Sequence, residues 1–310
     1  MATIVISEFM DEESVRALAA RTDVLYNPAL VDQPTLLLAE LANCRALIVR
    51  NRTQVRGDLL NAAPHLEVVG RLGVGLDNID VADCKARGII VHPATGANDD
   101  AVAEYVVCAT LSLFRRAYMR SGEIAAGAWP RESMIGHEIS GRRAGMVGFG
   151  GTARKAAARL AALGMQIAAY DPLLPDDHEA WQSAKRLGLN DLLAQSDVVS
   201  LHVPLTPSTH HMIDAAALSR MRKGAVLINA ARGGIVDEAA LVAALRGRFL
   251  GGAALDVFEH EPLDASYGQL FSGIQNLILT PHIAGVTVES NIRVSRKIAD
   301  LVLAALKLGS

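Results

Sequence analysis

The chain has 310 residues, of which 51% are hydrophobic and 4% aromatic, and its formal net charge is −3 at pH 7. A single core rarely grows past about 250 residues, so two domains are expected, and the slightly acidic balance argues against a general nucleic-acid surface. No apolar run reaches the roughly 20 residues of a membrane helix, and no signal-peptide pattern opens the chain. Cys44, Cys84 and Cys108 lack metal-type spacing, so we expect reduced thiols, no metal site and a cytoplasmic location.

Short β-branched apolar runs alternate with helical stretches in the first part of the chain. Strands are expected at 4–6, 46–49, 68–69 and 89–91, with helices at 11–20 and 33–41. This alternation is the βαβ rhythm of a parallel sheet.

A second series follows a long helix at about 99–117 and a loop that contains Trp129-Pro130. Its six expected strands lie at 144–147, 166–170, 198–202, 225–229, 252–256 and 277–279. Six strands with helices between them match a doubly wound dinucleotide-binding domain. The last expected helix, about Val288 to Leu308, could by itself cover either domain.

A glycine-rich turn, Gly148-Phe-Gly-Gly-Thr-Ala153, joins an expected strand to an expected helix. Gly148 permits the tight turn, and Gly150 lets the backbone approach a pyrophosphate at the helix N-terminus, beside Gly151 and Thr152. Ala153 replaces the third glycine, which affects packing only. Such a motif alone is weak evidence for a nucleotide site, because many glycine-rich turns serve only to reverse the chain.

Asp171 ends the next expected strand and supplies the acidic residue that the motif requires. It would accept hydrogen bonds from the adenosine ribose, and its charge would repel a 2′-phosphate, which favours NAD over NADP. The alternative is a turn residue, because Asp171-Pro172 is also a good turn.

Three short motifs, at residues 229–238, 256–262 and 280–285, carry the candidate catalytic residues Arg232, Glu261 and His282. Arg232 can bind carboxylate and carbonyl oxygens as a fork, since guanidinium is always charged. His282 can exchange a hydroxyl proton, and Glu261 can hold its other ring nitrogen, as in a triad without a nucleophile. Each could alone be a surface or loop residue, so the prediction rests on their joint occurrence at strand ends.

Two further strand ends are candidates for the cofactor site. Asp256 is expected to accept a bond from the nicotinamide carboxamide, or else to cap the following turn. Val203-Pro204 is expected to pass beside adenine or ribose, or else to be a plain exit from the strand.

The first domain offers candidate anion sites. Successive backbone N–H groups in the loop from Leu72 through Gly73 and Val74 to Gly75 are expected to bind the substrate carboxylate opposite Arg232, unless the loop merely needs glycine. Arg50 and Arg52, with Arg71 nearby, suit a second anionic group on the substrate. The alternative for these arginines is a solvated basic rim.

Together these motifs resemble the D-isomer-specific 2-hydroxyacid dehydrogenase family, in particular its 3-phosphoglycerate dehydrogenase-like branch without a C-terminal regulatory domain. The resemblance implies a catalytic Arg232, Glu261 and His282. It also implies an NAD site that includes Val74, Gly151, Thr152, Asp171, Val203, Ala230 with Ala231, Arg232, Asp256, His282 and Gly285.

The same resemblance implies the domain organisation. The C-terminal helix would return to a flavodoxin-like substrate-binding domain made of residues 1–97 plus 287–310. A Rossmann NAD-binding domain, residues 98–286, would be inserted into it. Both would be doubly wound α/β domains, and the family implies a homodimer formed through the NAD domains.

The expected substrate is a small D-2-hydroxy acid or its 2-oxo acid. Arg50-Asn-Arg-Thr53 differs from the smaller residues often seen in phosphoglycerate enzymes, so the prediction moves from 3-phosphoglycerate towards another doubly anionic acid such as 3-sulfolactate. The alternatives are a general glyoxylate/hydroxypyruvate reductase and a non-catalytic NAD(H)-sensing binding protein. Glu261 argues against a formate-type dehydrogenase, whose pattern has an amide there.

Overall fold

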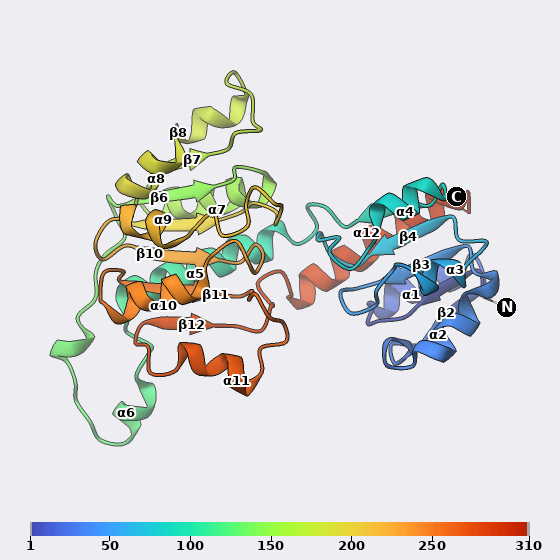
Figure 1. Cartoon of the computed structure of the whole chain (residues 1–310), viewed down its shortest axis with the longest axis horizontal. Coiled ribbons are helices and arrows are strands. Elements are labelled where there is room, and N and C mark those ends of the chain that lie inside the picture. Colours follow the sequence, from blue (N-terminus) through green and yellow to red (C-terminus); the bar gives the residue numbers. More distant parts are fainter. Residues whose placement is uncertain (1, 309–310) are drawn as a thin grey trace. The chain divides into compact units, whose positions relative to one another are not determined.

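The computed structural model describes residues 2–308 and divides into two compact units (Figure 1). Unit 1 extends to Asn98 and takes in the C-terminal segment from Val286, and unit 2 is Asp99–Gly285.

Unit 1 is built on a parallel sheet with the strand order β2-β1-β3-β4-β5. This is the order of flavodoxin-like folds. The four strands expected from the sequence are confirmed, and β2 is an edge strand that was not predicted. The strands are β1 (Ile4–Ile6), β2 (Val24–Tyr26), β3 (Ala46–Val49), β4 (Val68–Arg71) and β5 (Ile90–Pro93).

Helices cover both faces of this sheet. Helices α1 and α12 share one core with strand residues such as Ile4 and Ile48, to which α12 contributes Ile298 and Val302. Apolar side chains of α2, α3 and α4 form the core on the other face. The helices are α1 (Glu12–Ala19), α2 (Pro34–Glu40), α3 (Asp58–Asn61), α4 (Val81–Ala86) and α12 (Val288–Ala305), with 3-10 turns at Leu30–Asp32 and Leu41–Asn43.

Unit 2 contains a parallel sheet with the order β12-β11-β10-β9-β6-β7-β8. From β6 the strand order continues to β7 and β8 on one side and to β9, β10, β11 and β12 on the other. The order of strand addition therefore reverses between β6 and β9, and Rossmann folds bind ligands at such a switch point. All six expected strands are confirmed, and β8 is an additional short edge strand. The strands are β6 (Arg143–Val147), β7 (Gln166–Tyr170), β8 (Lys185–Arg186), β9 (Val198–Leu201), β10 (Val226–Asn229), β11 (Gly252–Leu255) and β12 (Leu277–Leu279).

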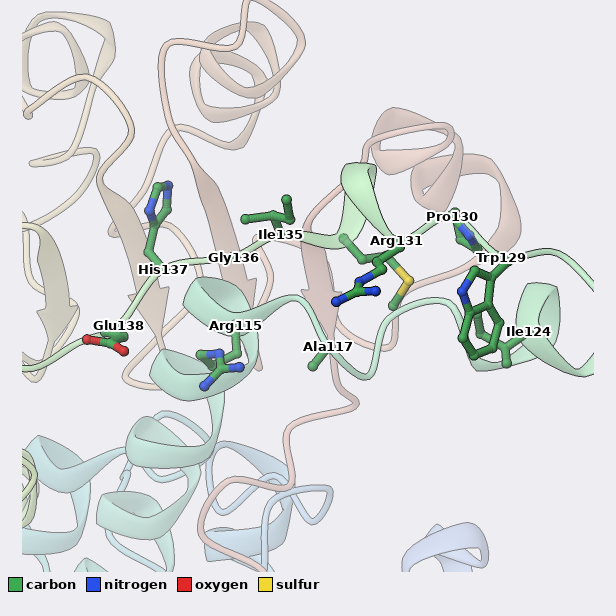
Figure 2. Close-up of a pocket in the computed structure, with 11 residues that line it drawn as sticks. Arg115, Ala117, Ile124, Trp129, Pro130, Arg131, Ile135, Gly136, His137 and Glu138 are labelled. Atoms are coloured by element: carbon green, nitrogen blue, oxygen red, sulfur yellow. The ribbon is translucent and has the colours of Figure 1, made fainter.

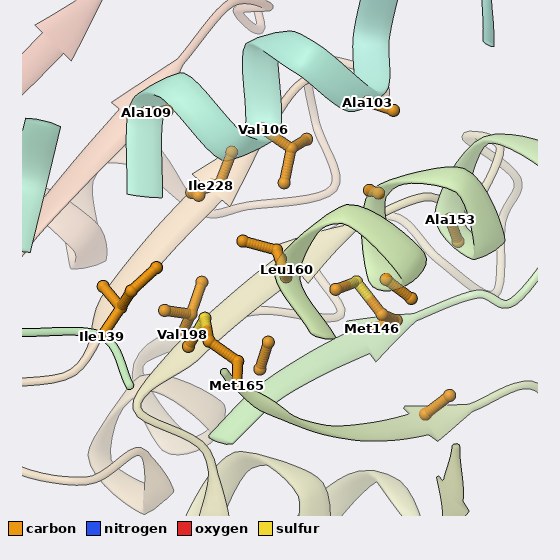
Figure 3. Packing of buried hydrophobic residues seen from close by; sticks show 14 of the residues in the cluster. Ala103, Val106, Ala109, Ile139, Met146, Ala153, Leu160, Met165, Val198 and Ile228 are labelled. Atoms are coloured by element: carbon orange, nitrogen blue, oxygen red, sulfur yellow. The ribbon is translucent and has the colours of Figure 1, made fainter. Parts of the chain in front are cut away.

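Two helix layers sandwich this second sheet. Helices α5 and α7 pack on one face, where Val106 and Leu160 meet Met146 and Ile228 of the strands (Figure 3). Helices α8, α9 and α10 cover the other. The helices are α5 (Asp99–Arg115), α6 (Ser121–Ala125), α7 (Gly151–Ala162), α8 (Leu189–Gln195), α9 (Ala215–Arg220), α10 (Glu238–Arg246) and α11 (Ala265–Gly268), with 3-10 turns at Glu132–Met134, Glu179–Ser183 and Gln269–Phe271.

The predicted fold class, two doubly wound parallel-sheet α/β domains, is therefore confirmed. Within residues 2–308, no helix is both long and apolar enough to span a membrane.

Candidate active site

The glycine-rich turn lies at the switch point of the unit 2 sheet, between β6 and α7. Gly148 has a φ of 87°. A Cβ at this position would lie 2.8 Å from the carbonyl oxygen of His202, the residue after β9, so only glycine fits. Among the described residues, no side chain caps the start of α7 at Gly150. The first N–H groups of this helix can therefore face an anion, as pyrophosphate binding requires.

Thr152, in the first turn of α7, is held by a carboxylate. Its hydroxyl donates to Asp99 Oδ1 at 2.6 Å, and Asp99 Oδ2 lies near Gly151. Both predicted cofactor residues thus lie at the helix N-terminus, next to the start of α5.

Asp171 follows β7 beside the same turn. Its Oδ2 accepts the Phe149 N–H and its Oδ1 accepts the Leu173 N–H, each at 2.9 Å. The turn role considered for Asp171 is therefore realised. A carboxylate has about four acceptor sites, so these two bonds leave capacity for ribose hydroxyls.

Val203 and Pro204 follow β9 on the other side of the turn. The side chain of Val203 would meet a Cβ at Gly148 at 3.0 Å, so it flanks the turn. The Pro204 carbonyl accepts from the Thr209 hydroxyl at 2.6 Å.

Arg232 lies just beyond β10, in a turn shaped by buried Asn229. The Asn229 side chain accepts the Ala231 N–H at 3.1 Å and donates to the Arg232 carbonyl at 2.9 Å. Ala230 and Ala231 thus form the turn between the strand and the arginine. The Arg232 guanidinium also donates to the Ala231 carbonyl at 2.5 Å.

Glu261 and His282 form a hydrogen-bonded pair. Nδ1 of His282 lies 2.7 Å from Glu261 Oε2, and Glu261 Oε1 accepts the Phe258 N–H at 2.9 Å. The ring's Nδ1–H donates to the carboxylate, which leaves Nε2 to act on a substrate. The side chain of His282 is 42% exposed, so this second nitrogen can reach a ligand.

The environment favours the charged form of Glu261. Burial raises the pKa of this carboxyl, but the hydrogen bonds from His282 and Phe258 and the charges of His282 and Arg232 outweigh it. The pKa therefore lies below its ordinary value of 4.5. The charge of Arg232 is one of the influences that lower the pKa of Glu261, the carboxyl that pairs with His282.

Asp256 holds the loop that carries His282. This buried carboxylate accepts from the Thr280 hydroxyl at 2.6 Å and from the N–H groups of Ile283 and Ala284 at 2.8 and 2.7 Å. Its carbonyl accepts the His282 N–H at 2.8 Å. His282 has a φ of 55°, which residues other than glycine rarely adopt, and these bonds hold it there. Among the described residues, Asp256 therefore supports the loop after β12 and is not seen to cap the turn that directly follows it. Gly285, the last residue of unit 2, directly follows this loop.

The predicted anion loop of unit 1 follows β4. The Leu72 N–H donates to the Val49 carbonyl and the Gly73 N–H to the Arg71 carbonyl, at 2.8 and 2.7 Å. Two of the four predicted N–H donors are therefore already hydrogen-bonded to backbone carbonyls. An anion at this loop has to use Val74 and Gly75.

The predicted arginine cluster separates into two environments. The half-buried Arg50 guanidinium donates to Asn291 Oδ1 at 3.1 Å and lies 5.9 Å from the Phe9 ring centroid. Burial lowers its pKa, and the charge of Glu8 opposes this shift. Arg52 instead forms an exposed ion pair with Asp32.

Glu8 is a functional candidate that the sequence analysis missed. Its buried carboxylate accepts the backbone N–H groups of Arg50, Arg52 and Thr53, at 2.9, 3.1 and 3.0 Å. It therefore fixes the loop from which Arg50 projects. An acidic residue at the end of β1 was the available signal, but its partners are more than forty residues away.

A pocket of about 470 Å³ lies between the end of α5 and the segment 117–138 (Figure 2). Figure 2 shows Trp129 and Ile124 towards one end and His137 and Glu138 towards the other. Tyr118, Trp129 and Ile135 in this segment are 79%, 78% and 72% exposed. The pocket contains none of the predicted site residues.

Comparisons with known proteins show the family to which the chain is similar. A family model for the NAD-binding domain of D-isomer-specific 2-hydroxyacid dehydrogenases matches residues 107–284. The chain is 53% identical over 307 residues to (S)-sulfolactate dehydrogenase of Chromohalobacter salexigens, with 99% of each chain covered. These matches confirm the resemblance inferred from the motifs.

Two further matches broaden the comparison. D-3-phosphoglycerate dehydrogenase of Mycobacterium leprae is 38% identical over 98% of this chain, which spans 56% of that relative's length. A crystal structure of D-lactate dehydrogenase from Aquifex aeolicus, complexed with NAD and lactic acid, superposes with a TM-score of 0.84. It is 27% identical and is covered over 95% of its length, against 98% of this chain.

Proposed function

Because this chain belongs to the D-isomer-specific 2-hydroxyacid dehydrogenase family, we propose that it interconverts a doubly anionic D-configured 2-hydroxy acid and its 2-oxo acid with NAD. The observation that carries this proposal is the 2.7 Å contact between His282 and Glu261, next to the charge of Arg232. These groups meet the needs of the reaction, which are a proton carrier, its anchor and a fixed cation.

His282 is proposed to move the hydroxyl proton at its Nε2 atom. In oxidation Nε2 accepts the proton, and in reduction it returns one to the carbonyl oxygen. Glu261 accepts from Nδ1 throughout, so it fixes the tautomer and stabilises the imidazolium that forms, without taking the proton itself. Bound NAD supplies the hydride acceptor for C2 of the substrate.

Arg232 is proposed to bind the substrate carboxylate and to polarise the oxygen at C2. The cofactor is proposed to rest on Gly148, Gly150, Gly151 and Thr152, with Asp171 on its ribose. The proposed further contacts are those predicted from the sequence at Val74, Val203, Pro204, Ala230, Ala231, Asp256 and Gly285. The uncapped α7 start, formed by Gly150, and the glycine at Gly148 support this assignment.

The proposed substrate is 3-sulfolactate or a close analogue with an anion on C3. The relative that is 53% identical is an (S)-sulfolactate dehydrogenase. The (S) label agrees with a D-specific family. In the stereochemical priority rules, sulfur makes the CH2–sulfonate branch outrank the carboxyl group, which changes the label of the D arrangement from (R), as in D-lactate, to (S). The spatial arrangement of (S)-sulfolactate at C2 is therefore that of a D-2-hydroxy acid.

Arg50 is the proposed contact for the second anion. Its guanidinium is half-buried and held by Asn291, so an ion pair there would be less screened by water than one at Arg52. Arg52 is given a lesser role because Asp32 already pairs with it. The backbone N–H groups of Val74 and Gly75 are proposed as further carboxylate donors, with Leu72 and Gly73 shaping the loop.

We also propose a homodimer formed through unit 2 and a cytoplasmic location. Figure 1 shows α6 on a segment that extends away from the unit 2 sheet, and this segment exposes Tyr118, Trp129 and Ile135. Large apolar side chains exposed along one segment are typical of an interface. Cys44, Cys84 and Cys108 are free thiols, which suits a reducing compartment.

The test is NADH oxidation with a panel of 2-oxo acids: pyruvate, glyoxylate, hydroxypyruvate, 3-phosphohydroxypyruvate, oxaloacetate and 3-sulfopyruvate. The proposal expects the highest kcat/KM with 3-sulfopyruvate. Highest activity on glyoxylate or hydroxypyruvate would instead indicate a general reductase. No turnover with any acid, while NADH still binds, would indicate an NAD(H)-sensing protein.

A further inference from the structure

The loop that carries Glu261 lies directly against the segment that carries Arg232. A Cβ on Gly233 would lie 1.8 Å from the Phe258 carbonyl oxygen and 2.9 Å from the Glu259 nitrogen, so the two backbones touch. Only glycine permits this approach. The contact is one residue from Arg232 on one side and two residues from Glu261 on the other.

Glu238, the first residue of α10, fastens this loop with a buried carboxylate that is 2% exposed. Its Oε1 accepts the Glu259 N–H and its Oε2 accepts the Tyr267 hydroxyl, each at 2.9 Å. Burial raises the pKa of Glu238. Burial and the neighbouring Glu238 also raise the pKa of Tyr267 well above its usual range, so Tyr267 remains a donor.

Glu259, on the loop, bonds in turn to the start of α10 and to His211. Its Oε1 lies 3.0 Å from His211 Nε2 and accepts the Glu238 N–H at a longer 3.4 Å. The His260 ring meets the Tyr267 ring edge-on at 4.7 Å. The two glutamates therefore bind each other's backbone, and His211 and Tyr267 complete the set. We call these four residues the loop clamp.

We propose that Glu238 and Glu259 are positioning residues that hold the loop 257–262 so that Glu261 stays on His282. This inference rests on the proposed function of the Glu261–His282 pair. The proton transfer depends on a 2.7 Å contact made from this loop. A displacement of about 1 Å at such a contact can cost about 100-fold in rate.

The kinetic test compares Glu238→Ala, Glu238→Gln, Glu261→Gln and the double variant Glu238→Ala/Glu261→Gln. Glu238→Ala should lower kcat by about 10- to 100-fold while the Kd for NADH, measured by fluorescence, stays unchanged. Glu238→Gln should retain most activity, because its amide oxygen can still accept the Glu259 N–H. The double variant should be no slower than Glu261→Gln alone, since the clamp acts through Glu261.

Wild-type rates in Glu238→Ala, or losses that multiply in the double variant, would overturn the clamp. Glu259→Ala tests the same contact from a partly exposed position if Glu238→Ala fails to fold. Hydrogen exchange of the segment 257–262 gives a readout without turnover, and it should accelerate in both alanine variants. A wild-type enzyme that reduces no 2-oxo acid would defeat the proposed function, whereas unchanged exchange in the variants would defeat the clamp.

Discussion

Nδ1 of His282 and Oε2 of Glu261 lie 2.7 Å apart, although the two residues come from different loops of unit 2. Asp256 holds one loop and Glu238 the other. The pair therefore rests on two supports, and each can be tested separately.

Replacing His282 removes the proton carrier. His282→Asn should lower kcat by about 10²- to 10⁴-fold, the usual contribution of general acid–base catalysis. The Kd for NADH should stay nearly unchanged, because the uncapped start of α7 remains intact. Stopped-flow turnover and fluorescence titration measure the two quantities. Near-normal turnover would remove His282 from the mechanism.

The lowered pKa of Glu261 predicts a pH-dependent stability. A carboxyl whose pKa is lower in the folded state contributes stability above its ordinary pKa of 4.5, and this contribution is lost as the pH falls through the lower folded-state value. The Tm difference between the wild type and Glu261→Gln should therefore be largest near neutral pH and shrink below pH 4.5. A constant difference from neutral to acid pH would show that the ionised form of Glu261 adds no stability.

Asp171 combines a turn role with a proposed cofactor role, and one substitution separates them. Asp171→Asn keeps the size and removes the charge, and its single acceptor oxygen can keep the bond from either the Phe149 or the Leu173 N–H, which Asp171 accepts with two different oxygens. The kcat/KM ratio of NADP to NAD should rise by about tenfold, equivalent to about 1.4 kcal/mol. An unchanged ratio would leave Asp171 as a turn residue only.

Substitutions of Arg50 and Arg52 test the proposed contact with the second anion of the substrate, with Arg52 as the control. Arg50→Ala should lower kcat/KM for 3-sulfopyruvate by about 10- to 100-fold, the cost of a lost charged hydrogen bond, and should affect pyruvate much less. Arg52→Ala, which breaks only the exposed pair with Asp32, should change kcat/KM for 3-sulfopyruvate by about threefold or less. Equal losses on both acids would mean that Arg50 supports the loop rather than the second anion.

The apolar segment around Trp129 predicts the dimer contact. Trp129→Ser with Ile135→Ser should reduce the mass measured by sedimentation velocity from dimer to monomer. Leu173→Ser is the control, because Leu173 is 90% exposed and lies outside this segment. A variant that stays dimeric would place the interface elsewhere.

Sequence patterns predicted most of the fold because its central strands are apolar and its turn depends on glycine. Two edge strands were missed for physical reasons. Strand β2 is only three half-buried residues, and β8 is an exposed Lys185-Arg186 pair without any apolar signal.

Residue type alone suggested that Glu261 would hold a ring nitrogen of His282, and the structure shows this contact. Contacts across long sequence separations were not predictable. The carboxylate of Glu8 meets a loop that follows β3, and Arg52 pairs with Asp32. Glu238 was not among the predicted site residues, because nothing near it in the sequence indicates the Glu259 N–H as its partner.

The most direct test of the proposed function is NAD reduction with purified (S)- and (R)-sulfolactate. Turnover is expected with the (S) isomer alone, since it has the D arrangement at C2 and carries the second anion for Arg50. Preference for the (R) isomer, or no NAD reduction with either isomer, would contradict it.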